Sequence, residues 1–182
     1  MREFTYVLAT LAVSGMMVMG CEPADPGEET ETEDLGAALA PAWEAYRDTA
    51  TALSNDDEEA ARDEAGELRD AVAGVDSGVL EGDDAAFWED HAGALAEALD
   101  EMIDADDIEG MREAFEPVSI ETRELLARFH GDQLGPIYVL NCPMAFDDEG
   151  ADWLQADEQT RNPYFGDAMY SCGGVTETIS AG

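Results

Sequence analysis

Apolar residues recur every three or four positions along the middle of the chain, between Leu35 and Phe129. They fall into four runs, and this spacing places the apolar side chains of each run on one face of a helix. The most regular run consists of Ile108, Met111, Phe115, Val118, Thr122, Leu125 and Phe129. Pro117 lies inside that run and lacks a backbone donor, so we expect a kink or a break there, with Ser119 capping a restart. The pattern predicts four consecutive amphipathic helices.

Short polar stretches separate the four runs, at residues 54–57, 77–84 and 104–107. They contain the Ser, Asn, Asp and Gly residues that favour turns and helix caps. Because such short connections leave little room for crossovers, residues 35–131 are predicted to form an up-down antiparallel four-helix bundle. No alternation typical of strands is evident, so the predicted fold class is all-α.

Residues 132–182 change in character, because glycine, proline and aromatic residues replace the helical periodicity. About fifty residues of irregular chain are uncommon in a compact domain and are usually functional. The six aromatic side chains of this region need burial, and the bundle surface is the nearest place. We therefore expect an irregular extension, rich in cysteine, methionine and aromatic residues, that packs on the bundle.

The chain begins with the pattern of an export signal. Arg2 precedes an apolar run that ends in "VMGC", which resembles the lipobox of bacterial lipoproteins. Residues 1–20 are thus predicted to be a signal peptide and Cys21 to carry the lipid; plain secretion and an uncleaved anchor are the alternatives. Residues 21–34 are rich in Pro, Gly, Glu and Thr and are predicted to be an acidic flexible tether. The expected location is the membrane surface, facing the periplasm or the cell exterior.

The charge balance limits the partners. The chain has 44 Asp and Glu against 8 Lys and Arg, with a formal net charge of −36. Such a surface repels nucleic acid and anionic lipid headgroups, so membrane contact is expected through the lipid anchor only. Metal cations and basic partners are compatible with this negative charge. Because 45% of the residues are hydrophobic and periodic, we expect a folded protein of a salty, halophilic habitat, where ions screen its self-repulsion.

No enzymatic motif stands out. There is no HExxH, phosphate-binding glycine loop or CxxC pair, and carboxylates are too abundant for any pair of them to be informative. The protein is therefore predicted not to be an enzyme.

Two sulfur pairs mark the last third of the chain: Cys142-Pro-Met144 and Met169-Tyr-Ser-Cys172. Thiolate and thioether are soft donors, which select Cu(I), Ag(I) or similar ions. If "NPYFG" at residues 162–166 turns the chain back, the two pairs could form one site. Cys142, Met144, Met169 and Cys172 are thus the candidate metal ligands.

Two other interpretations of these residues stay open. Cys142 and Cys172 are the only cysteines besides Cys21, and in an oxidising compartment they could form a disulfide. It would close a loop of about thirty residues, worth roughly 3 to 4 kcal/mol in the chain-entropy estimate. Met144 and Met169 could also be ordinary packing residues.

"CPMAFDDEGADWLQ" and "NPYFGDAMYSCGGV", starting at Cys142 and Asn162, resemble the C-terminal signature of a bacterial domain-of-unknown-function family. That family occurs as lipoproteins and fused to CusB-type periplasmic adaptors of copper/silver efflux pumps. The resemblance implies a link to heavy metals, with an efflux adaptor or a metallochaperone as partner.

The expected function is that of a lipid-anchored envelope protein that binds or hands over Cu(I) or Ag(I). The alternative is a structural or interaction lipoprotein with a Cys142–Cys172 disulfide.

Overall fold

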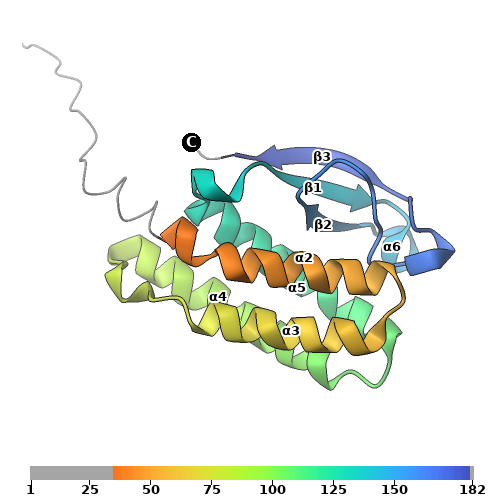
Figure 1. Ribbon diagram of the computed structural model, residues 1–182, viewed down its shortest axis with the longest axis horizontal. Coiled ribbons are helices and arrows are strands. Elements are labelled where there is room, and N and C mark those ends of the chain that lie inside the picture. Colours follow the sequence, from red (N-terminus) through yellow and green to blue (C-terminus); the bar gives the residue numbers. More distant parts are fainter. Residues whose placement is uncertain (1–34, 181–182) are drawn as a thin grey trace, which may run out of the picture.

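The computed structural model describes residues 35–180, so the predicted signal peptide, the predicted lipidation site Cys21 and the predicted tether lie outside the described residues. Four long helices form its core, and consecutive helices run in opposite directions along the long axis (Figure 1). They are α2 (Ala40–Ser54), α3 (Glu58–Ala73), α4 (Gly82–Asp104) and α5 (Ile108–Phe129). The prediction of a helical core is confirmed. Within residues 35–180, no helix is long and apolar enough to cross a membrane.

Aspartate side chains in the polar stretches start two of these helices. Asp57 accepts a hydrogen bond from the Ala60 amide at 3.1 Å, and Asp107 accepts one from the Gly110 amide at 2.9 Å. Each carboxylate thus satisfies an amide that has no partner within the helix and also favours the positive end of the helix dipole.

α5 passes through Pro117 without a break, so the expected restart at Ser119 is wrong. Phe115 and Val118 are fully buried on either side of the proline, and their packing holds the helix together. Ser119 does not cap a helix. Its hydroxyl shares a 2.8 Å hydrogen bond with the buried hydroxyl of Tyr46 on α2.

The all-α prediction is wrong for the C-terminal part, which forms a three-stranded antiparallel sheet of order β2-β1-β3. The strands are β1 (Ile137–Cys142), β2 (Ala151–Gln155) and β3 (Gly174–Ile179). β1 lies in the centre, and its neighbouring residues Val139 and Leu140 are both buried, so its first four residues are an apolar run without alternation. Short segments complete the fold: the 3-10 helices η1 (Ser77–Val79), η2 (Asp132–Leu134) and η3 (Gly166–Ala168), and the single turn α6 (Ala145–Asp148).

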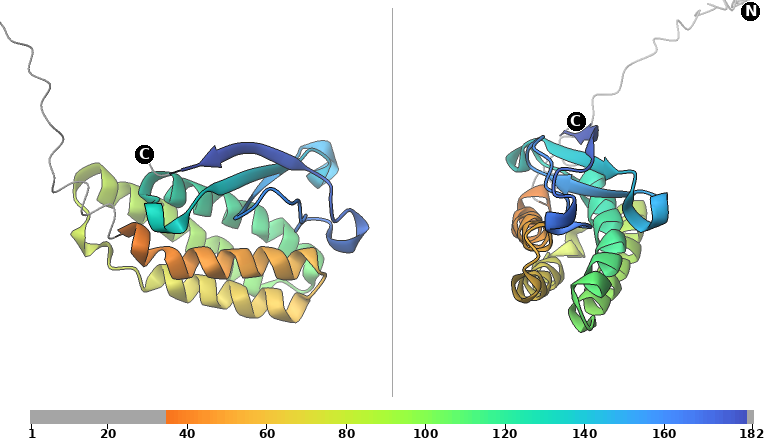
Figure 2. Two further views of the ribbon diagram at one scale, coloured as in Figure 1. Left: turned by 45° about the horizontal axis from the view of Figure 1, so that its top comes forward. Right: turned by 90° about the vertical axis from the view of Figure 1, so that its right-hand side faces the viewer.

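The sheet covers the side of the bundle formed by α2 and α5 (Figure 2). Tyr46 joins the two layers, because its ring stacks on Phe115 at 5.4 Å and its hydroxyl accepts a hydrogen bond from the Leu154 amide at 3.1 Å. Burial raises the pKa of Tyr46, which keeps the phenol protonated. Arg123 of α5 also pairs with Asp152 of β2, at 3.0 Å. The extension therefore packs on the bundle as expected, but as a sheet.

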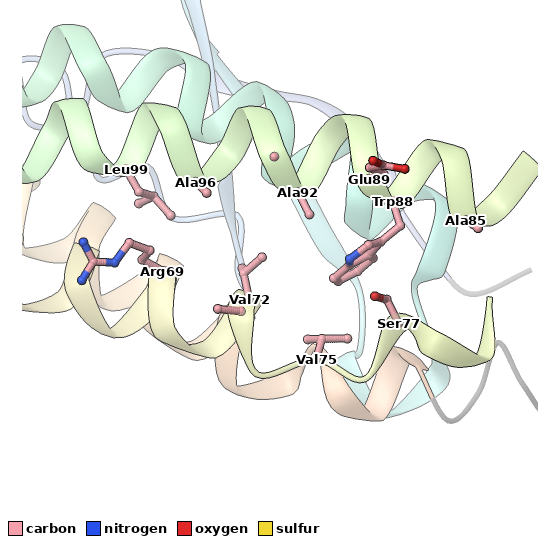
Figure 3. Close-up of a pocket in the computed structure, with 12 residues that line it drawn as sticks. Arg69, Val72, Val75, Ser77, Ala85, Trp88, Glu89, Ala92, Ala96 and Leu99 are labelled. Atoms are coloured by element: carbon pink, nitrogen blue, oxygen red, sulfur yellow. The ribbon is translucent and has the colours of Figure 1, made fainter. Parts of the chain in front are cut away.

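α3 and α4 lie on the side of the bundle away from the sheet, and a groove of about 520 Å³ separates them (Figure 3). Trp88 and Val72 point into it from opposite helices, while Ala92 and Ala96 leave part of the space unfilled. Small side chains thus account for the groove.

Candidate metal centre

The two candidate cysteine ligands meet at one end of the sheet. Cys142 is the last residue of β1, and Cys172 precedes β3 by two residues. Because Asn141 pairs with Gly174 across the two strands, the chain brings Cys172 beside Cys142. Their Sγ atoms lie 3.2 Å apart. Cys142 is completely buried and Cys172 is half-buried, so the pair is reached from the side of Cys172.

Asn162 folds the loop that carries Cys172. Its side chain is fully buried and accepts hydrogen bonds from the amides of Tyr164, at 2.8 Å, and Phe165, at 3.3 Å. Its Nδ2 donates to the carbonyl of Cys172 at 3.0 Å. The segment "NPYFG" therefore turns the chain back, as the proposed site requires.

Gly173 allows the close approach of the two strands. Its φ is +110°, and a Cβ built on it would lie 2.6 Å from the carbonyl oxygen of Asn141 and 2.7 Å from the ring of Trp153. Glycine adopts this positive φ without strain, and because it has no Cβ it avoids both close contacts.

The aromatic side chains of the extension pack together between the loop that carries Cys172 and helix α5. The ring of Tyr164 packs edge-on against Phe146 at 5.4 Å and Trp153 at 6.1 Å, and it contacts Phe115 of α5 at 6.0 Å. Arg112 of α5 donates from Nε to the carbonyl of Pro163 at 3.0 Å. The thiol site thus rests on the helical core.

The two candidate methionine ligands are placed differently. Met144 begins the turn after β1 and is 48% exposed. Met169 is half-buried at the end of η3, and its carbonyl accepts a hydrogen bond from the Cys172 amide at 2.9 Å. The structure therefore brings two of the four candidate ligands, the thiols, into direct contact.

An unusual turn follows Met144. Phe146, Asp147 and Asp148 all have positive φ, between 51° and 71°, and Gly150 follows with φ +83°. Three successive left-handed residues that are not glycine cost conformational energy. The turn carries exposed carboxylates close along the chain to the thiols, which favours a cation there.

The surroundings of Cys172 favour its protonated form before a ligand binds. The hydrogen bond with Cys142 raises the pKa of Cys172, and burial and the neighbouring sulfur add to this effect. A soft ion that binds here must displace thiol protons. Within residues 35–180, no group of three or more His, Cys, Asp and Glu side chains is arranged to hold a metal ion.

Both histidines have structural partners. Nδ1 of His91 lies 2.7 Å from a carboxylate oxygen of Glu121, and Nε2 of His130 donates to the carbonyl of Gly135 at 2.7 Å. Each bond fixes its ring at a position along the bundle.

Two polar residues that organise the extension were missed from the sequence. Asn162 and Gln155 were each part of a quoted motif, but neither was assigned a role. Gln155 is 5% exposed and uses its whole amide: it accepts from Trp153 Nε1 and the Arg161 amide, and it donates to the carbonyls of Asp157 and Gln159. In "WLQ" and "NPYFG", an uncharged amide next to aromatic and apolar residues is the signal that could have identified them.

The fold and the site define a helical-core protein whose small C-terminal sheet carries a thiol pair. A family model described as a protein of unknown function (DUF3347) matches residues 43–133, half of the chain, and the chain belongs to this family. The match covers the helices, whereas the resemblance noted in the sequence was most specific in the last fifty residues. No curated protein and no solved structure matches the chain.

Proposed function

We propose that this protein is a lipid-anchored protein of the cell envelope that binds a soft metal ion, Cu(I) or Ag(I), and hands it over in heavy-metal handling or efflux. The observation that carries the proposal is the 3.2 Å contact between the Sγ atoms of Cys142 and Cys172. Sulfur donors select Cu(I) and similar ions over hard cations. The net charge of −36 also favours the approach of a cation.

Cys142 and Cys172 are the primary ligands in this proposal, and Met144 and Met169 are additional ones. Each thiol that binds the ion loses its proton to solvent, so binding exchanges protons for one metal ion. Met144 is 48% exposed, so its side chain has room to turn toward an ion at the thiols. The ion enters beside Cys172, because Cys142 is fully buried.

The exposure of the candidate ligands is compatible with transfer of the ion to an efflux adaptor or a metallochaperone, which is part of the proposal. Ligand exchange between two proteins needs donors that the partner can reach, and the half-buried Cys172 and the exposed Met144 meet this need. A partner with a basic face would complement the acidic surface around them.

An anaerobic titration of the reduced protein with Cu(I), in competition with a chromogenic chelator, tests the proposal. We expect one tightly held ion per chain, and loss of competition in Cys142→Ala and Cys172→Ala. Met144→Leu should weaken binding by roughly tenfold, corresponding to about 1.4 kcal/mol. Met102→Leu is the matched control, because Met102 is a fully buried core methionine of α4. If wild type and Cys142→Ala compete equally poorly, the proposal fails.

The same sulfur contact also favours the second candidate, a structural or interaction lipoprotein with a Cys142–Cys172 disulfide. Its formation removes two protons and two electrons and requires an oxidant of the envelope. A free-thiol count on the exported protein separates the candidates: two free thiols favour the metal site, and none favours the disulfide.

A further inference from the structure

Arg47 on α2 differs from the other arginines of the described chain. Every other arginine of residues 35–180 forms an ion pair with a carboxylate; these are Arg62, Arg69, Arg112, Arg123, Arg128 and Arg161. Arg47 lies over the ring of Trp43, 5.5 Å from the ring centroid. Its Nε is buried and has no hydrogen-bond partner among the described residues. A buried donor without an acceptor is costly, and it is unexpected in a chain with 44 carboxylates.

Arg47 lines a small cavity of about 120 Å³ between α2 and the loop that follows β2. Asp48 and Thr51 also line it from α2, and Gln155, Asp157 and Arg161 line it from β2 and the loop. The lining thus contains two arginines and two aspartates, and Arg47 is the arginine without an ion pair. The volume of the cavity is well above what a single water molecule needs, which suits a group of a few heavy atoms.

The wall opposite Arg47 is formed before any ligand arrives. Gln155 donates to the carbonyls of Asp157, at 3.2 Å, and Gln159, at 2.8 Å, and it accepts from the Arg161 amide at 3.0 Å. Nη2 of Arg161 pairs with Asp157 at 2.8 Å. Because these bonds already order the loop, a ligand does not have to do so.

From these features we infer that the cavity is a binding site for a carboxylate group, with Arg47 as its main ligand and Arg161 as the second positive charge. The guanidinium of Arg47 offers a planar set of donors that matches the two oxygens of a carboxylate. A carboxylate also supplies the counter-charge that Arg47, unlike the other arginines of residues 35–180, lacks. Asp48 and Asp157 in the lining disfavour anions of higher charge, such as phosphate.

The carboxylate could belong to a free organic acid or to an acidic residue of a peptide, and both present the same group. This inference does not depend on the proposed metal site, since the cavity is built from α2 and the loop after β2 and contains no sulfur.

The most direct readout is the Nε–H resonance of Arg47 in a proton–nitrogen NMR spectrum. Acetate is titrated in place of chloride at a constant sodium concentration of about 0.5 M, where the Debye length is roughly 4 Å and the net charge is screened. We expect a saturable shift of this resonance with a millimolar midpoint, and a midpoint at least ~10-fold higher for phosphate.

Three variants sharpen the test, with acetate binding followed through the resonances of Thr51 and Gln155. Arg47→Gln should raise the acetate midpoint at least ~10-fold, and Arg47→Lys, which keeps the charge but loses the planar donors, should raise it less. Arg128→Gln is the matched control, because Arg128 also lies over an aromatic ring, that of Phe87, but is already paired with a carboxylate. It should leave the midpoint unchanged.

A short capped peptide with one glutamate identifies the source of the carboxylate. A midpoint at least ~10-fold below that of acetate assigns the site to a protein partner, and an equal midpoint assigns it to free acids; both support the inference. A linear, unsaturable shift, an equal response in Arg47→Gln, or tighter binding of phosphate than of acetate would overturn it.

Discussion

The helical region (residues 40–129) and the sheet region (residues 137–179) are stabilised by different kinds of interaction. The helices rely on periodic apolar burial, with fully buried residues such as Leu53, Leu68 and Leu99. Buried polar side chains occur in both regions, but those of the helices are hydroxyls such as Ser119, which makes one side-chain bond. In the sheet region the buried amides of Asn162 and Gln155 bond several groups each. Apolar cores tolerate changes that conserve volume, whereas a buried polar network fails when one member is lost. The difference predicts that single changes near the thiols have larger effects than comparable changes among the helices.

The largest expected effect follows from Asn162→Ala. The substitution removes three side-chain hydrogen bonds and leaves buried amides without acceptors, so we expect a loss of about 3 kcal/mol in the free energy of unfolding. The comparison in the helical region is Ser119→Ala, which removes one buried hydrogen bond and should cost about 1 kcal/mol. Urea unfolding measures both values. Equal losses would contradict the contrast between the two regions.

Gly173→Ala should come next. The added Cβ would meet backbone and ring atoms closer than 3 Å, and φ of +110° strains any residue other than glycine. We expect a loss of about 2 to 3 kcal/mol and slower oxidation of the Cys142–Cys172 pair, because the two strands are pushed apart. Gly174→Ala is the matched control, since nothing lies within 4 Å of its Cβ position. An unchanged midpoint of urea unfolding in Gly173→Ala would sink this explanation.

Adding atoms to the helical region should have the opposite sign. Ala92 faces the groove between α3 and α4 (Figure 3), so Ala92→Leu fills space beside Trp88 and should raise stability by about 1 kcal/mol. Ala94→Leu, on the exposed face of the same helix, controls for helix propensity and should change little. Thermal unfolding in matched salt measures the difference. A lower melting temperature in Ala92→Leu would show that the groove cannot accept the side chain.

The smallest expected effect concerns the ion pair that connects the two regions. Arg112 holds the pKa of Asp56 below its ordinary value of 3.8, and the Asp167 amide contributes through a hydrogen bond. Because the folded-state pKa is lowered, the carboxylate stabilises the fold above pH 3.8 and loses this contribution as the pH falls through the lowered pKa.

Asp56→Asn should therefore cost less than about 1 kcal/mol at neutral pH, since the Asp56 side chain is exposed, and the cost should shrink below pH 4. Asparagine tolerates the positive φ of 57° at this position, so backbone strain does not confuse the result. Asp70→Asn removes the same charge from a more exposed pair and serves as the control. A cost independent of pH in unfolding experiments would exclude the ion pair as its source.

How far the sequence predicts the fold also differs between the two regions. The helices were predictable because the three-to-four spacing is long, and residues such as Asp57 and Asp107 mark their starts. The strands were missed because β1 is buried on both faces and a register shift between Val139 and Leu140 interrupts its pairing with β3. β-branched and aromatic residues in "IYVL" were the available signal for a strand.

The candidate site was also predictable only in part, because its residues are recognisable in the sequence but their contact is not. Cys142 and Cys172 stand out chemically, and the turn at residues 162–166 could be anticipated from its proline and glycine. The contact of the thiols depends on the β1–β3 register and on the buried bonds of Asn162, which no local pattern encodes. The placement of Met144 at the surface likewise follows from the left-handed turn after β1.

X-ray absorption at the copper edge is the most direct test of the central claim, that the thiol pair of the sheet region binds a soft metal. The reduced protein is loaded with one equivalent of Cu(I) without oxygen and desalted. The proposal predicts a first coordination shell of sulfur alone, supplied by Cys142 and Cys172 with thioether added, and loss of copper on desalting when both cysteines are replaced by alanine. A shell of nitrogen and oxygen, or copper retained equally by the double variant, would contradict it.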